Sequence, residues 1–448
     1  MYTTTIGRTF LKAYNQANNT DYCARTFFEN IFIPLFFDHS KYMMPGGNSP
    51  FENSFGTVPK RAKSDDMILG KKPFETPERR KERIEKILNK IETEPADSSI
   101  AIGYPVLDET AGTSGQITNI ELPENKDDVY LSWIGAGLGL GVEEGITILF
   151  NHEKVLLDIF EGWKHYRERL NKTALMKGNQ INTWNGHWLA HYYDTHGFES
   201  DDPTFGMNPL DTTKSGLLNI PTISWVKVLL SIAARYKEQA LIGYLYKIGQ
   251  ANSTYGFIPF NLSEISRPNN FYKNIFGVST FMQDAKKLEQ LYGTAFGLRA
   301  ACSMGSIGVQ AMEPQGLKSY MPSVKDVKKI SIKDNDDEQR ITFNTYLIWI
   351  IAMMNNEKLW EISREVAQKL LIYTSGADKA RTNRASNVEA LLASFKRKQF
   401  LQNLIKIIEE NKTVDFEEIG KIVHFMPEDN FSYFNTLVKF QYALLIKK

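Results

Sequence analysis

Cysteine is almost missing from this chain, because its 448 residues contain only Cys23 and Cys302. Two cysteines so far apart exclude a disulfide framework and a four-cysteine zinc site, and this usage is typical of a reducing compartment. An excess of charge of one sign is missing too: the formal net charge is +1. The overall balance therefore points to no class of partner, and only the local distribution of charge can indicate one.

Long apolar runs are also lacking. The longest, Tyr346–Met354, has about half the length that a membrane-spanning helix needs. The N-terminal segment has no basic region followed by an apolar one, which is the pattern of a secretory signal. The sequence predicts a cytoplasmic protein with no membrane partner.

Complete nucleotide-binding motifs are absent from the glycine-rich run Gly135–Gly141 (GAGLGLG). The dinucleotide fingerprint needs Gly-x-Gly-x-x-Gly, but the third glycine position falls on Leu140 when the register starts at Gly135, and on Val142 when it starts at Gly137. No Lys-Ser/Thr pair follows, as a P-loop would require. A flexible or tightly packed turn is therefore favoured over a phosphate-binding loop.

The sequence contains only part of a zinc-protease motif. His187 and His191 have the i, i+4 spacing of zinc ligands on a helix, and His196 offers a third imidazole. The general base of that motif is a glutamate directly after the first histidine, and here the residue is Trp188. Histidines that are hydrogen-bonded within the fold are the favoured interpretation, and a metal-dependent hydrolase is the alternative. The sequence predicts no enzyme, no catalytic residue, no metal and no cofactor.

The residues that are present indicate an ordinary globular protein, with 42% apolar and 23% charged residues. A polar, charged segment over 325–340 suggests a domain boundary, and helical periodicity dominates after it. The four periodic segments are Ile341–Thr374, Asn387–Asn411, Phe416–Phe425 and Asn430–Ile446. We predict an α+β fold, in which an irregular mixed α/β body over 1–330 precedes a four-helix bundle over 341–448.

Within the body, helices are expected in several segments. Pro34 should kink or end the first of them, and Pro77 should begin the second. The expected helices are 24–37, 77–91, 149–170, 225–247 and 283–301. Short strands with glycine-rich turns are expected over 100–150.

Two segments are locally basic. Lys60–Lys90 contains 11 Lys/Arg against 6 Asp/Glu, and Ala377–Lys398 contains six against two. A single run of this kind usually marks a solvated helix face. Two runs in an otherwise neutral chain indicate contacts with nucleic-acid phosphates as an equal alternative.

Three stretches of the sequence also resemble a known family. They are TIGRTFLKAYN…FFENIFIPLFFDH near the start, the loop GGNSPF and the segment QINTWNGHWLAHYYD. Together with a helical, basic C-terminal part, they resemble the large subunit of the type I CRISPR Cascade surveillance complex, in the divergent form found in Bacteroidetes. The resemblance lies in the order of the segments and in their amino-acid sequence, over most of the chain. It includes no catalytic signature.

The resemblance implies a function without catalysis. Such a subunit inspects double-stranded DNA for the protospacer-adjacent motif, helps open the duplex and holds the displaced strand for a separate helicase-nuclease. Its partners are the CRISPR RNA and the other Cascade subunits. RNA–DNA base pairing reads most of the target, and protein contacts read only the short motif.

The resemblance also implies site residues. Asn48 and Asn53 would contact base edges, Phe51 would insert between base pairs, and Lys60, Arg61 and Lys63 would hold phosphates. The residues expected to follow the displaced strand or neighbouring subunits are Arg381, Arg384, Lys396, Arg397 and Lys398. A capped turn remains an equal alternative for GGNSPF, and a protein-binding scaffold without salt-dependent DNA binding is the third function considered.

Overall fold

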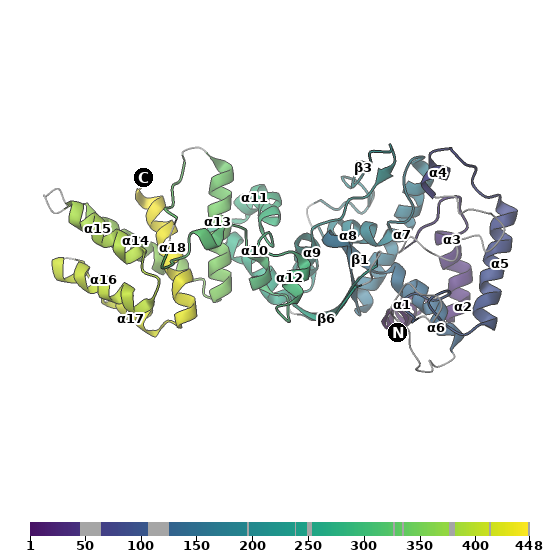
Figure 1. Ribbon diagram of the computed structural model, residues 1–448, viewed down its shortest axis with the longest axis horizontal. Coiled ribbons are helices and arrows are strands. Elements are labelled where there is room, and N and C mark those ends of the chain that lie inside the picture. The colour runs from purple at the N-terminus through teal and green to yellow at the C-terminus, as the bar shows by residue number, and fades with distance from the viewer. Residues whose placement is uncertain are drawn as a thin grey trace. The chain divides into compact units, whose positions relative to one another are not determined.

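The computed structural model describes residues 1–44, 64–105, 125–194, 197–237, 239–248, 253–325, 328–333, 336–375, 381–411 and 414–446. The chain forms two compact units. Unit 1 comprises Met1–Leu262 and Leu298–Ser306, and unit 2 comprises Ser263–Gly297 and Ile307–Lys448. A small antiparallel sheet and a C-terminal run of helices confirm the predicted α+β class (Figure 1). Within the described ranges, no helix has the length and apolar character needed to cross a membrane.

In unit 1, two helices far apart in sequence pack at unusually short range. They are α1 (Tyr2–Asn18) and α6 (Lys126–Gly137). A Cβ on Gly7 would lie 2.1 Å from the Leu131 carbonyl oxygen, and one on Gly135 would lie 1.9 Å from the Thr3 carbonyl oxygen. Only glycine allows backbones to approach so closely. The expectation of strands over 100–150 is therefore wrong for 126–137.

The segment 24–37 is helical, as predicted, but the helix type changes from α to π and back to α within it. It consists of α2 (Ala24–Phe27), the π-helical turn η1 (Phe28–Phe32) and α3 (Ile33–Phe36). Pro34 has no backbone N–H to donate, and the helix ends soon after it.

The end of α3 is held by a buried arginine of α7 (Glu153–Lys172). Arg167 donates from Nε to Leu35 O (2.7 Å), from Nη1 to Lys41 O (2.8 Å) and from Nη2 to Phe36 O (3.3 Å). Only 5% of its surface is exposed. Its guanidinium therefore satisfies carbonyls that a helix C-terminus leaves without intrahelical partners.

The main sheet of unit 1 has the order β1-β2-β5-β6, with antiparallel neighbours throughout. Its strands are β1 (Leu140–Val142), β2 (Ile146–Phe150), β5 (Ala240–Lys247) and β6 (Ser253–Asn261). The small second sheet pairs β3 (Asp211–Thr212) with β4 (Leu218–Asn219). The single helix expected over 225–247 is wrong, because α9 (Trp225–Arg235) ends there and β5 follows.

Two more helices complete the surroundings of this sheet. α8 (Ile181–Tyr192) packs against β1, α7 and α9. α12 (Leu298–Cys302) packs against β6 and the turn η2 (Glu143–Gly145). Through α12, the chain returns to unit 1 after it has already entered unit 2.

The basic helix predicted over 77–91 is α5 (Pro77–Thr93), which follows the short α4 (Ser64–Ile68). Its start is capped by Thr76, whose side chain accepts from the Arg79 backbone N–H. Arg80 and Arg83 are buried. Arg83 pairs with Glu75, and Arg80 lies 3.6 Å from the carboxylates of Glu75 and Asp38. These two arginines thus neutralise carboxylates inside unit 1 and do not add to a basic surface.

Unit 2 is helical in its described residues. Its helices are α10 (Leu262–Phe276), α11 (Val278–Leu291), α13 (Asp337–Met354), α14 (Leu359–Thr374), α15 (Arg381–Leu392), α16 (Arg397–Glu410), α17 (Glu417–Phe425) and α18 (Glu428–Ile446), with the 3-10 turns η3 (Val309–Met312) and η4 (Leu317–Ser319). Four helices are expected from residue 341 onward, but the structure has six, α13 to α18 (Figure 1). The first breaks at Asn355, which ends α13 in the left-handed conformation with φ 48°. The second breaks between α15 and α16 at residues 393–396.

The polar segment 325–340 does not separate the two units. Asp284 of α11 forms a bidentate pair with Arg340 of α13, at 2.9 and 3.1 Å. Trp349 Nε1 donates to Val309 O at 2.8 Å. Residues before and after the segment therefore share one unit, and the units divide at residues 262/263, 297/298 and 306/307 instead of at 330–341.

Lys439 of α18 provides a test of the packing in unit 2. Its Nζ donates to Tyr320 O at 3.1 Å, and burial lowers the pKa of Lys439 from 10.5 to about 8. Between pH 8 and 10.5 the unfolded chain therefore binds more protons than the folded chain, so this group adds stability as the pH rises through that window. We expect wild type to gain stability relative to Lys439→Met between pH 8 and 10.5, with a constant difference below pH 7.

Urea denaturation of both proteins at several pH values measures this difference. Lys421→Met is the matched control, because Lys421 is exposed and its hydrogen bond to Glu417 raises its pKa. A difference between wild type and Lys439→Met that stays flat from pH 7 to 10.5 would show that Lys439 is solvated.

Candidate nucleic-acid interface

The residues predicted to read the DNA motif lie outside the described residues. All six fall within 45–63: Asn48, Phe51, Asn53, Lys60, Arg61 and Lys63. Their roles remain predictions from the sequence.

The five C-terminal basic residues do not form one continuous stripe. Arg381 and Arg384 lie at the start of α15, whereas Lys396–Lys398 lie beyond its end, where α16 begins. α15 is roughly 17 Å long at 1.5 Å per residue. Since α15 and α16 pack against each other, the two groups of basic residues belong to opposite ends of the α15–α16 pair (Figure 1).

Arg384 lies beside a polar network that joins three helices. Tyr373 of α14 donates to Glu410 of α16 (2.6 Å), and Asn387 of α15 donates to the same carboxylate (2.9 Å). Burial raises the pKa of Tyr373, and the half-buried Arg384 acts against that rise through its charge. Arg384 thus takes part in the packing of these helices, in addition to any contact with a displaced DNA strand.

Arg397 is also committed to the fold. It donates to His424 O (3.0 Å) and Met426 O (2.5 Å), and its Nε lies 3.3 Å from the Glu428 carboxylate. These contacts fix the turn between α17 and α18 against the start of α16. Lys396 and Lys398 are exposed and remain as the cations suited to phosphate contacts.

The histidine pair is hydrogen-bonded within unit 1. His187 donates from Nε2 to Pro221 O (2.8 Å), and His191 from Nε2 to Pro203 O (3.2 Å). Burial lowers the pKa of His187. His196 lies outside the described residues. Elsewhere in the described ranges, no three or more His, Cys, Asp or Glu side chains are grouped to hold a metal ion. The interpretation of His187 and His191 as residues bonded within the fold is confirmed.

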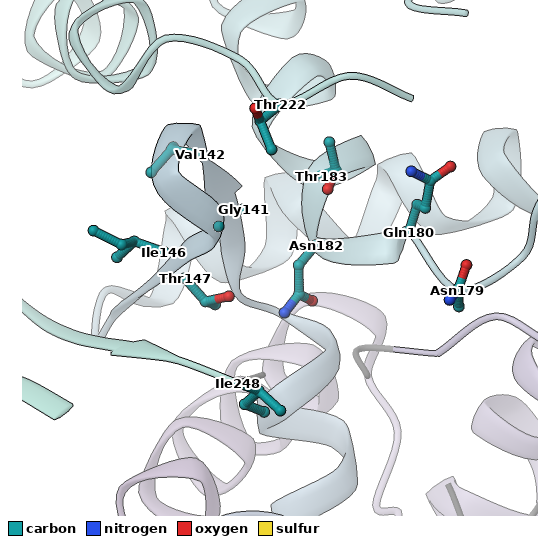
Figure 2. Close-up of a pocket in the computed structure, with 11 residues that line it drawn as sticks. Gly141, Val142, Ile146, Thr147, Asn179, Gln180, Asn182, Thr183, Thr222 and Ile248 are labelled. Atoms are coloured by element: carbon teal, nitrogen blue, oxygen red, sulfur yellow. The ribbon is translucent and has the colours of Figure 1, made fainter. Parts of the chain in front are cut away.

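The glycine-rich run lines a small polar pocket. A Cβ on Gly141 would lie 2.8 Å from the Thr183 backbone nitrogen, so this glycine lets β1 pack directly on the first turn of α8. Of the flexible or tightly packed turn that the sequence predicts, only the tight packing is found, because Gly135 and Gly137 belong to α6 and Gly141 belongs to β1. The adjoining pocket has a volume of about 140 Å³ and lies between β1, β2 and the start of α8 (Figure 2). Its polar lining comes from Thr147, Asn179, Gln180, Asn182, Thr183 and Thr222.

An aromatic cluster with one exposed and two half-buried rings lies on the same unit. We call it the aromatic platform and define it as Tyr2, Tyr244 and Phe257. The ring centroids are 4.9 Å apart for Tyr2–Tyr244, 5.0 Å for Tyr2–Phe257 and 5.2 Å for Tyr244–Phe257. Phe257, on strand β6 at the end of the sheet, is 60% exposed. An exposed ring of this kind, held in place by the half-buried Tyr2 and Tyr244, is suited to stacking on an unpaired base.

Sequence reasoning missed the platform, because the segment ALIGYLYK is apolar almost throughout and shows no alternation of polar and apolar residues. In the structure it forms β5, in which Leu241, Gly243 and Leu245 are buried between more exposed neighbours. Recognising a strand there would have placed Ile242 and Tyr244 on one face.

Comparison of the chain with protein-family models, curated proteins and solved structures finds no match.

Proposed function

We propose that this chain is the non-catalytic large subunit of an RNA-guided type I CRISPR Cascade complex. It recognises the protospacer-adjacent motif in double-stranded DNA, helps open the duplex and holds the displaced strand for a separate helicase-nuclease. The observation that carries the proposal is the aromatic platform of Tyr2, Tyr244 and Phe257. Duplex opening exposes the flat faces of bases, and accessible aromatic rings bind such faces without regard to sequence.

The other roles follow from this proposal. Asn48 and Asn53 read base edges of the motif, Phe51 separates base pairs, and Lys60, Arg61 and Lys63 hold phosphates. The exposed Lys396 and Lys398 of unit 2 contact the backbone of the displaced strand. The complex works in the cytoplasm with the CRISPR RNA and the other Cascade subunits.

The first test replaces the most exposed ring of the aromatic platform. Phe257→Ala should weaken binding of the purified protein to single-stranded DNA and to duplexes with an open bubble, by about 1–3 kcal/mol for one lost stack. Binding to closed duplex without the motif should change far less. Fluorescence anisotropy with labelled oligonucleotides measures all three affinities.

The matched control for this test is Phe205→Ala. Phe205 is 56% exposed, but it lies in a turn outside the sheet. Equal affinities of Phe257→Ala and Phe205→Ala for bubble DNA would remove the aromatic platform from DNA binding and, with it, the main support for the proposed function.

The second test concerns the exposed lysines of unit 2. Lys396→Ala combined with Lys398→Ala should weaken DNA binding evenly across sequences. It should also reduce the slope of log K against log salt by up to about 1.4, because two fewer phosphates of a single strand are neutralised. Titrations at several salt concentrations give the slope. An unchanged slope would assign both lysines to a solvated surface.

Arg397→Ala separates this effect from helix packing. Because Arg397 holds the turn between α17 and α18, its loss should lower the melting temperature, whereas the double lysine variant should keep it.

A further inference from the structure

The polar pocket at the start of α8 contains a buried amide whose oxygen is unpaired. Asn182 is 7% exposed, and its Oδ1 has no hydrogen-bond partner among the described residues. Asn185, one turn later on α8, donates to Gly137 O (2.7 Å) and Gly139 O (2.9 Å), and its own buried Oδ1 likewise has no hydrogen-bond partner among the described residues. Asn185 thus ties α8 to the glycine-rich run. Asn182 lines the pocket with an acceptor that the described protein groups leave unsatisfied, and buried groups of this kind are uncommon in folded proteins.

The start of α8 also faces this pocket without a side-chain cap. Its N-cap residue, Gln180, makes no capping bond. The Gln180 amide instead donates to Ile220 O (3.0 Å) and accepts from Ile220 N (2.8 Å). Backbone N–H groups at the start of a helix are donors without intrahelical partners. The pocket thus combines the acceptor of Asn182 with donors at the start of α8.

The pocket has a floor and a rim. Asn182 lies at the floor with the buried Val142 and Ile146, and the exposed Thr222 and Ile248 lie at the rim. Figure 2 shows the Asn182 side chain extending from α8 toward Thr147 and Ile248. The occupant therefore meets both polar groups and aliphatic side chains, at the floor as well as at the rim.

The lining limits the chemistry of the occupant. The pocket-lining residues include no Asp, Glu, Lys or Arg, so no charged side chain there neutralises an ionic ligand. The unpaired atom is an acceptor, so the occupant must supply a hydrogen-bond donor, which a fully ionised phosphate does not have. A volume of about 140 Å³ is well below the 300–1,000 Å³ typical of pockets for drug-sized ligands. These limits fit a small, neutral, planar ring with a donor next to an acceptor.

We propose that this pocket binds a single unstacked nucleobase, with Asn182 pairing with its edge. An asparagine amide offers one acceptor and one donor side by side, which is the pattern that matches the N6 and N7 edge of adenine. The base comes either from a free nucleoside or from an unpaired position in a strand. The site goes beyond the proposed function, because it requires neither a motif nor a duplex.

Calorimetric titration of the full-length protein with adenosine, guanosine, cytidine and thymidine tests the first source. Oligonucleotides with one central base, compared with the same strands lacking that base, test the second. We expect a preference for one base in at least one of these series. Asn182→Leu, which keeps the size but removes both polar atoms, should weaken that binding roughly tenfold or more. Because it also removes an unpaired buried amide, it should keep or raise the melting temperature.

Two further proteins make the result decisive. Asn89→Leu, at an exposed position of α5, should bind as wild type does. Phe257→Ala should retain the base-dependent binding, so that a failure of the aromatic platform and a failure of the pocket are told apart. Binding of free nucleosides identifies a small-molecule site, and base-dependent binding of strands alone identifies a base within a strand. No base-dependent binding in either series, or equal binding by Asn182→Leu, overturns the proposal.

Discussion

Replacing Arg167 by methionine is expected to lower the free energy of unfolding of unit 1 by roughly 3–5 kcal/mol. Methionine keeps much of the aliphatic stem but removes every donor. The carbonyls of Leu35, Phe36 and Lys41 then lose a charged partner in a site where Arg167 is only 5% exposed. Phe36 O keeps the Met43 backbone N–H at 2.9 Å, so the unpaired acceptors are those of Leu35 and Lys41. Each buried acceptor left without a partner costs about 1–3 kcal/mol. Burial lowers the pKa of Arg167 to about 10, so the side chain is charged at pH 7 and its bonds are charge-assisted.

Urea denaturation followed by tryptophan fluorescence measures this loss. Five of the seven tryptophans belong to unit 1, at positions 133, 163, 184, 188 and 225, so the signal reports chiefly on that unit. Lys164→Met is the control, because Lys164 lies on the same helix with an exposed side chain. Surface changes of that kind usually stay within 0.5 kcal/mol. Similar midpoints for the two variants would mean that water replaces the guanidinium at low cost.

Alanine at Gly7 or Gly135 is expected to destabilise unit 1 by about 3 kcal/mol each. The added Cβ would lie 2.1 Å from Leu131 O or 1.9 Å from Thr3 O, and both are backbone atoms that move only if α1 and α6 separate. Overpacking of a well-packed contact typically costs 1–3 kcal/mol, and occasionally more. Denaturant midpoints of the single variants measure the cost.

The double variant is the sharper experiment. Once one Cβ has forced α1 and α6 apart, the second meets less resistance. The double variant should therefore lose much less stability than the sum of the losses in the two single variants. Gly420→Ala is the control, because a Cβ at this position of α17 meets nothing within 4 Å. It should stabilise the protein by about 0.4–1 kcal/mol. Full additivity of Gly7→Ala and Gly135→Ala would show that the two glycines do not share one contact.

Local signals in the sequence were sufficient for some elements. α5 was found because Pro77 begins it and apolar residues recur at helical spacing up to Ile91. α6 was missed because residues 129–137 are all buried, and a helix covered on every side has no polar face to reveal its period. The break at Asn355 was missed as well, although asparagine is one of the residues that end helices in the left-handed conformation.

Tertiary contacts explain the remaining differences. The sequence marks Arg80 and Arg83 as basic, but only the fold places Glu75 beside them. Likewise, Arg397 reads as a surface cation until the turn between α17 and α18 supplies its acceptors. The pocket around Asn182 draws on residues as distant as Thr147 and Thr222. No local pattern could bring these side chains together.

The return of α12 to unit 1 has a consequence for synthesis on the ribosome. Leu298 and Ala301 are buried against a unit whose main segment ends at Leu262. The chain must therefore be extended by 44 residues, from Leu262 to Ser306, before that unit has all its parts. At about 5–20 residues per second, this interval lasts roughly 2–9 s. Throughout it, the surface of β6 and of the turn at 143–145 that α12 later covers is open to chaperones and to other nascent chains.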